Sequence, residues 1–394
     1  MNDAPYTGGR GLVTKATAVA VIALALTLVG GFFDARRALW AYHFAFTYWA
    51  GIGLGALLVL GSFHATKARW PVVIRRMTET FSATGILFLV LFIPIAIGVK
   101  KLFPWADPQG YGLDGELLHL VEVRGPWLNV PFFLLRTGIY FALWIGFAWT
   151  LYRLSVRQDE EGGFALTDRQ RRIAAVSLPL VGLAISFAAF DWQMSLDPHL
   201  SSTIFGVYYF SGSYLCALAV IILAAQWTRS SGLFGAYVSP AHFHSLGKLL
   251  LSFYCFWAYI AFSQYLLIWI ANIPEEVTWY VHRNQGGWLV LGVFLVLFHF
   301  VVPFFILLSR DLKRDGRKLS VMAIWALVVH AVDVYWVMMP GLEPEAPSLH
   351  FTDLTALVGV GAAALAFVVW RMRGVRTVPV GDPYLADSLR YDPS

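Results

Sequence analysis

Ten apolar blocks, separated by short polar segments, constrain this chain more than any other feature. Each is roughly 18 to 25 residues long, which is the length an α-helix needs to cross the hydrocarbon core of a bilayer. The blocks show no alternation of apolar and polar residues, so they do not match the strands of a membrane β-barrel. Because a lone span must satisfy its own backbone hydrogen bonds, we predict an all-α polytopic membrane protein with ten transmembrane helices. The blocks cover residues 14–33, 40–63, 79–98, 131–152, 173–190, 203–226, 247–273, 286–309, 319–340 and 350–370.

The composition excludes a soluble globular protein. Of the 394 residues, 58% are hydrophobic and only 13% are charged, about half the charged share of an ordinary soluble domain. The first block is longer than the core of a typical signal peptide and ends in the bulky, charged sequence GGFFDARR, so we expect it to be retained. The net charge of +5 is attributed to topology, and the expected partner of the basic loops is the lipid bilayer rather than a nucleic acid.

The lysines and arginines predict the orientation of the chain. Most of the 29 basic residues fall in the segments on the same side as the N-terminus, and few fall on the opposite side. The positive-inside rule therefore places both termini in the cytoplasm, including a polar tail over residues 371–394. We expect the whole chain, 1–394, to form a single integral membrane domain.

A weak internal repeat predicts how the helices are grouped. FTYWAGIGLGALLV (46–59) resembles VYYFSGSYLCALAV (207–220), and FDWQM (190–194) resembles VYWVM (334–338). The matches pair the second helix with the sixth and the fifth with the ninth. An even shift gives both copies the same orientation, as in a parallel repeat about an axis along the membrane normal.

The repeat predicts two four-helix bundles. Helices 2–5 form the first, over residues 40–190, and helices 6–9 form the second, over residues 203–340. Helices 1 and 10 flank the pair. Chance similarity between apolar helices is the alternative explanation of the matches.

Ionisable residues inside the spans are candidates for function because burying them in lipid is costly. His43, Arg136 and Asp191 lie toward the outer side. Oxidation of a quinol needs proton acceptors near the ring, typically a histidine and a carboxylate, so these three residues form one candidate quinol pocket. A structural ion pair between Arg136 and Asp191 is the alternative.

Deeper ionisable residues suggest a proton path. His330 and Asp333 are three residues apart in the ninth span, so they share a helical face, and His299 lies at similar depth in the eighth. Glu79 at the cytoplasmic start of the third span and Tyr259 in the seventh complete the candidate path, with the outer Asp191 and Arg136. Such side chains accept and release protons or hold water, as a relay requires.

Other uses of these residues are less well matched. Haem ligation needs paired histidines on facing helices, and only His299 and His330 have similar depth. The two cysteines, Cys216 and Cys255, form no CxxC pair and are too few for a disulfide framework or an iron–sulfur site, and we predict no metal site. A secondary transporter also uses repeats and buried carboxylates, but helices broken at matched positions are not evident.

Three segments carry a family resemblance: FDWQMSLDPHLSSTIFGVYYFSGSY (190–214), WLNVPFFLLRTGIYFALW (127–144) and VPVGDPYLADSLRYDP (378–393). With them the chain resembles the NrfD-like integral membrane subunits of bacterial alternative complex III, a quinol:cytochrome c oxidoreductase. It is most similar to the F-type members, whose length and ten spans it shares.

The resemblance implies a non-catalytic subunit of the bacterial inner membrane with no redox cofactor of its own. Its partners would be a sister NrfD-like subunit and subunits that carry iron–sulfur clusters and c-type haem, and in some assemblies a terminal oxidase. The subunit would anchor these partners and provide a polar route for protons during electron transfer. A bound quinone or phospholipid is compatible with this role.

Overall fold

The computed structural model describes residues 5–230 and 237–392, and in these residues the chain forms helices and no β-strand. Ten helical spans are long and apolar enough to cross a membrane, which confirms the predicted all-α, ten-span fold. Each predicted block overlaps one span. The spans are α1 (Arg10–Phe33), α2 (Ala35–Ala65), α3 to α5 (Val72–Ile97), α8 (Val130–Glu161), α9 with η2 (Phe164–Leu196), α10 (Phe205–Ser230), α11 (Pro240–Ala271), α13 to α14 (Gly286–Leu308), α16 with η4 (Gly316–Gly341) and α17 (Phe351–Met372).

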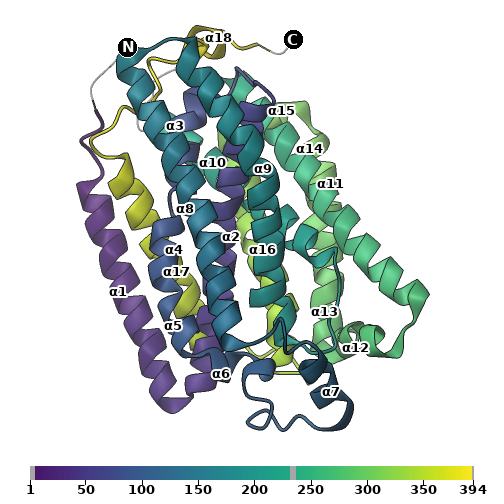
Figure 1. Cartoon of the computed structure of the whole chain (residues 1–394). Helices are drawn as coiled ribbons and strands as arrows, with labels where there is room; N and C mark the ends of the chain where they lie inside the picture. Colours follow the sequence, from purple (N-terminus) through teal and green to yellow (C-terminus); the bar gives the residue numbers. More distant parts are fainter. Residues whose placement is uncertain (1–4, 231–236, 393–394) are drawn as a thin grey trace.

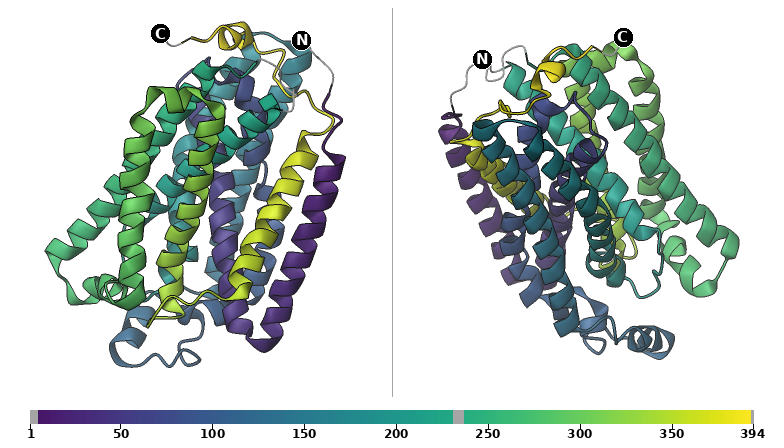
Figure 2. Two further views of the ribbon diagram at one scale, coloured as in Figure 1. Left: turned by 180° about the vertical axis from the view of Figure 1, so that it is seen from behind. Right: turned by 45° about the horizontal axis from the view of Figure 1, so that its top comes forward.

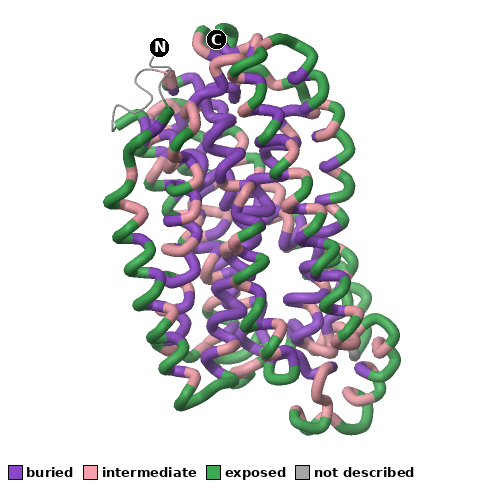
Figure 3. The backbone as a smooth tube through the Cα atoms, turned by 60° about the vertical axis from the view of Figure 1, so that its left-hand side comes forward, coloured by how far each residue is buried: buried purple, intermediate pink, exposed green. Residues whose placement is uncertain are grey.

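Helices α2 and α10 form the centre of the molecule. In α2, 94% of the most apolar stretch is buried, whereas the corresponding share in α1 is 28%. The two central helices pack closely because α2 presents glycine: a Cβ atom at Gly55 would overlap the backbone of Ser213 on α10. Figure 3 shows this buried centre surrounded by helices that are exposed on their outer faces.

The other spans surround this centre in two groups. Helices α3, α8 and α9 pack around α2, and α11 and α16 pack against α10. Helices α1 and α17 lie side by side along one edge (Figure 1). The two segments matched in the repeat, 46–59 and 207–220, lie in α2 and α10, but the parallel repeat itself stays a prediction.

Both chain ends meet at one end of the bundle, which we call the inner end (Figure 1). The backbone of Tyr6 bonds to Gly374 and Val375, just after α17. The segment that follows, with the short helix α18 (Leu385–Leu389), packs across the inner end, where Asp382 forms a buried ion pair with Arg75 of α3. The charge distribution predicts that this end faces the cytoplasm.

The opposite, outer end carries short connecting helices. The connection after the third span contains α6 (Val99–Leu102), η1 (Pro104–Ala106) and α7 (Gly115–Val123). It contacts the bundle through Trp105, whose indole N–H donates to Ser195 over 3.1 Å. Helix α12 (Pro274–Arg283) links α11 to α13 at this end, and α11 leans away from the bundle as it approaches α12 (Figure 2). At the inner end, α15 (Arg310–Arg314) precedes α16.

Candidate functional site

The structure brings together three of the candidate proton-path residues deep in the second group of helices. Asp333 and His330 lie on α16, and His299 lies in η3 (Val296–Val301), a π-helical turn between α13 (Gly286–Leu295) and α14 (Val302–Leu308). One potential ligand atom from each residue falls within 4.8 Å of the others. Nδ1 of His330 is 3.2 Å from a carboxylate oxygen of Asp333, and the two imidazole rings meet edge to face at 5.6 Å. We call these residues the Asp333 cluster.

The carboxylate of Asp333 is completely buried and is held by neutral donors. The hydroxyl of Tyr208 on α10 donates to one oxygen. The indole N–H of Trp257 on α11 donates to the other over 3.1 Å. Within the described part of the chain, no lysine or arginine forms an ion pair with Asp333.

This environment has a consequence for the charge of the cluster. Moving an uncompensated carboxylate out of water into the protein interior costs several kcal/mol, and it persists only with a compensating charge or proton. Among the described residues no lysine or arginine supplies that charge, and the ionisable side chain next to Asp333 is His330. Nδ1 of His330 lies 3.2 Å from the carboxylate without forming a hydrogen bond, so a side chain that can carry a proton is close to Asp333.

The π-helical turn that carries His299 has an identifiable cause. Pro303 lies four residues after His299, so it cannot donate to the His299 carbonyl, and its ring would clash with that carbonyl in a regular α-helix. The helix widens locally instead, and such turns are frequent at functional sites. The His299 ring stacks on Trp257 at 3.8 Å, and its two buried nitrogens have no hydrogen-bond partner among the described residues.

A cavity of about 430 Å³ connects the Asp333 cluster with the outer half of the molecule. It lies between α10, α11, α12, α13 and α16, and Asp333 and Tyr208 line it. The wall of this cavity is mainly aliphatic and aromatic. The polar groups farther out along its wall are those of Gln264, Tyr280 and Asn284.

Helix α12 is fixed beside this cavity by Arg283. This buried guanidinium stacks on Trp279 at 3.6 Å and donates to the carbonyl of Val337 over 2.7 Å. Burial lowers the pKa of Arg283 to about 10. Its nearest carboxylate is Asp197, at 3.9 Å. Burial raises the pKa of Asp197, but hydrogen bonds from His199 and the charge of Arg283 outweigh this and leave that pKa below its ordinary value.

Arg136 and Asp191 form a separate, saturated ion pair. Two guanidinium nitrogens donate to the two carboxylate oxygens over 2.9 and 2.7 Å. The Tyr140 hydroxyl and the Trp127 indole supply two further donors, at 2.8 and 3.2 Å. His43 does not join them, because its Nε2 lies 2.5 Å from the backbone carbonyl oxygen of Trp192. The geometry of Arg136 and Asp191 is that of a structural ion pair.

The other two candidate residues lie elsewhere. Glu79 is buried near the inner end, 3.3 Å from both Arg75 and Arg76. Its contacts belong to a charged network that also includes Asp159. The side chain of Tyr259 is 66% exposed on the outside of α11 and does not face the Asp333 cluster.

Asp333, His330 and His299 could together offer three ligand atoms to a cation. Tyr208 and Trp257 donate one hydrogen bond to each oxygen of Asp333, which leaves part of its acceptor capacity free. The edge-to-face contact of His299 with His330 leaves no space for a porphyrin between the two rings. The same side chains can also exchange a proton, because an imidazole and a carboxylate each have an acidic and a basic form.

Two residues that contact Asp333, Tyr208 and Trp257, are absent from the candidates chosen from the sequence. Trp257 had a detectable signal: Tyr254, Trp257 and Gln264 are spaced by three and seven residues, which places them on one face of α11. All three are buried. Tyr208 had no such signal, since its role depends on how α10 packs against α16.

Comparison with known proteins adds no relative. No model of a known protein family matches this chain. A search of curated proteins finds no match either.

Proposed function

We propose that this chain is an integral membrane subunit of an assembly of the alternative complex III type. In this role it anchors the redox subunits and exchanges protons through its second group of helices. One observation carries the proton-exchange role: Asp333 is fully buried, has no fixed cation among the described residues, and contacts His330 beside a cavity. The anchoring role and the identity of the assembly are supported only by the sequence resemblance.

The geometry favours exchange between the Asp333 cluster and the outer end. The cavity beside Asp333 carries polar groups in this direction, from Tyr208 to Asn284. Toward the inner end, the neighbour of His330 is Tyr48, whose hydroxyl is occupied by the backbone carbonyl of Leu327. Leu327 lines a second, apolar cavity that offers no comparable polar groups. We therefore propose an outward-facing proton site rather than a route across the full membrane.

A quinol pocket at His43, Arg136 and Asp191 draws less support. Every strong acceptor position of Asp191 is occupied by a protein donor, so a quinol would have to break the ion pair to use it. A secondary transporter would not require redox partners. Copurification of redox subunits with the chain therefore distinguishes a subunit of a redox complex from a secondary transporter.

The test uses the intact complex, purified through an affinity tag on this chain. We expect haem-bearing and iron–sulfur subunits to copurify. In vesicles, Asp333→Asn should retain quinol oxidation while the amount of protons released per electron changes. Glu116→Gln, which alters an exposed carboxylate on α7, is the matched control and should behave as the unmodified complex. Purification without redox partners would refute the assembly. Unchanged proton release in Asp333→Asn would refute the proton-exchange role alone.

A further inference from the structure

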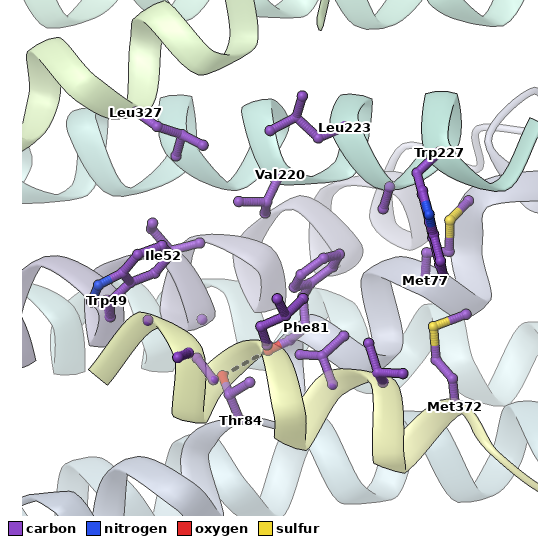
Figure 4. Close-up of a pocket in the computed structure, with 18 of the residues that line it drawn as sticks. Trp49, Ile52, Met77, Phe81, Thr84, Val220, Leu223, Trp227, Leu327 and Met372 are labelled. Carbon is purple, nitrogen blue, oxygen red and sulfur yellow. Dashed lines mark hydrogen bonds between the residues drawn. The ribbon is translucent and has the colours of Figure 1, made fainter. Parts of the chain in front are cut away.

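A second large cavity lies in the inner half of the molecule and takes no part in the site described above. Its volume is about 570 Å³, within the range of about 300 to 1,000 Å³ found for ligand sites. Figure 4 shows side chains from α2, α3, α10, α16 and α17 surrounding it. Those labelled there are Trp49, Ile52, Met77, Phe81, Thr84, Val220, Leu223, Trp227, Leu327 and Met372.

The interior of this cavity suits a hydrocarbon occupant. The indole N–H of Trp49 donates to the carbonyl of Leu357 over 2.8 Å. The hydroxyl of Thr84 donates to the carbonyl of Phe81 over 2.7 Å (Figure 4). These polar groups are therefore engaged with the protein backbone, and the remaining wall is almost entirely aliphatic and aromatic. A polar ligand would lose its hydration there and gain few hydrogen bonds.

Basic residues lie next to, or two residues from, lining residues of the cavity in the sequence. Arg229 follows the lining residue Thr228, Arg371 and Arg373 flank the lining residue Met372, and Arg10 precedes Leu12. The segments 5–15, 220–230 and 358–376, which carry these residues, contain no aspartate or glutamate.

The charge of these arginines is not neutralised within the described part of the chain. Arg371 and Arg229 lie over the rings of Tyr152 and Phe243, at 4.2 and 5.7 Å, and neither forms an ion pair there. Nε of Arg373 is buried without a hydrogen-bond partner among the described residues. Positive charge beside an apolar cavity complements a molecule with an anionic head and a hydrocarbon tail.

We propose that this cavity binds an anionic glycerophospholipid of the inner leaflet. One acyl chain fills the cavity between α17 and α10, and the phosphate group faces Arg373. The lipid then joins the α1–α17 pair to the central helices. It also keeps the region next to Leu327 free of water, on the inner side of His330. The proposal stands independently of the proton-exchange function.

The test is native mass spectrometry of the full chain in detergent, after incubation with phosphatidylglycerol or phosphatidylcholine that carry identical acyl chains. Ala224→Phe fills the cavity from α10, and Ala142→Phe makes the same change on the exposed face of α8. We expect phosphatidylglycerol to remain bound to the unmodified chain and to Ala142→Phe, and to fall at least tenfold in Ala224→Phe. Arg373→Gln should reduce the preference for phosphatidylglycerol by about fivefold, the effect of one basic residue at a membrane surface.

Equal retention in Ala224→Phe and Ala142→Phe would overturn the proposed site, and equal binding of the two lipids would overturn the anionic head group. If Ala224→Phe does not yield monodisperse protein, Leu365→Trp tests the same cavity from α17, where Leu365 is half-exposed. Retention unchanged in Leu365→Trp would likewise contradict the proposal.

Discussion

Two buried aspartates, Asp191 and Asp333, show how a partner determines the role of a residue. Asp191 faces the guanidinium of Arg136, so its negative charge is balanced by a permanent positive charge. Asp333 faces a phenol, an indole and an imidazole, and of these only the imidazole of His330 can supply a positive charge by taking up a proton. The first arrangement stabilises the fold, and the second is suited to exchanging a proton.

The ion pair between Arg136 and Asp191 makes a testable contribution to stability. Arg136→Met removes one partner and leaves a buried carboxylate, so we expect the free energy of unfolding to fall by about 3 to 5 kcal/mol. In Arg136→Met/Asp191→Leu both charges are gone, and most of that loss should be recovered. Denaturant titration of the purified chain measures both variants. A double variant as unstable as the single one would show that the pair does not act as a unit.

The Asp197 carboxyl predicts a pH dependence at the outer end. Its folded-state pKa lies below the unfolded value, which is about 3.9. The group therefore adds stability above that value, and the added stability is lost as the pH falls through the lower, folded-state pKa. We expect Asp197→Asn to lower the thermal midpoint at neutral pH, and this difference to shrink when the pH is lowered to about 3. A difference that stays constant over this range would be the contrary result.

The residues of the cluster were only partly predictable from the sequence. A carboxylate inside an apolar block is conspicuous, and the spacing of His330 and Asp333 indicates a shared face. The hydrogen bonds from Tyr208 and Trp257 were not predictable, because they come from helices that are distant in sequence. Such contacts depend on helix rotation and packing, which the apolar pattern of a nearly uniform span does not specify.

At the scale of the helix, periodicity separates the polar and aromatic residues of α11 into two faces. Tyr254, Trp257 and Gln264 recur close to whole turns of 3.6 residues and are buried. Tyr259 lies five residues after Tyr254, or roughly 140° around the helix axis, and is exposed. Tyr259 therefore lies on the face of α11 that points away from the Asp333 cluster, and the spacing of these residues along the span is sufficient to place it there.

The π-helical turn is a second feature whose cause is visible in the sequence. A proline inside an apolar span leaves the carbonyl four residues earlier without its backbone donor. Here Pro303 of α14 leaves the carbonyl of His299, in η3, without that donor. The apolar block that contains His299, 286–309, predicts a transmembrane helix but not this local distortion. The distortion that directs His299 toward Trp257 and His330 follows from Pro303.

The close packing of α10 against α16 can be tested at Gly212. A Cβ atom at this position would overlap the imidazole ring of His330. We expect Gly212→Ala to displace that ring and to destabilise the protein by about 1 to 3 kcal/mol, as overpacking does in a filled core. Gly138→Ala on α8 is the matched control, because its added methyl group meets no atom within 4 Å. Thermal unfolding in detergent compares the two, and equal stabilities would contradict the close contact.

At the scale of the whole molecule, the number and order of the spans were predictable because each span reports its own length and hydrophobicity. The arrangement of the spans was less accessible. Both α1, at the edge, and α2, at the centre, are apolar enough to cross a membrane, so hydrophobicity alone does not distinguish their positions. The glycines of α2 are the local signal for a central position, since they permit close approach of another helix.

The predicted orientation can be checked in intact cells by cysteine labelling. In a background of Cys216→Ala and Cys255→Ala, a single cysteine is placed by Ala386→Cys at the inner end or by Glu116→Cys at the outer end. We expect a maleimide that does not cross membranes to label Glu116→Cys only, because the basic loops retain the inner end in the cytoplasm. Labelling of Ala386→Cys without cell lysis would reverse the assigned orientation.

The central claim, that Asp333 exchanges a proton with its cluster, is tested most directly by infrared difference spectroscopy of the purified chain. The buffer is exchanged from H2O to D2O at constant pH. We expect the carboxyl C=O absorption to shift on deuteration, and this shift to be absent from Asp333→Asn and present in Glu116→Gln. A carboxyl absorption that does not shift, or a shift that persists unchanged in Asp333→Asn, would contradict the claim.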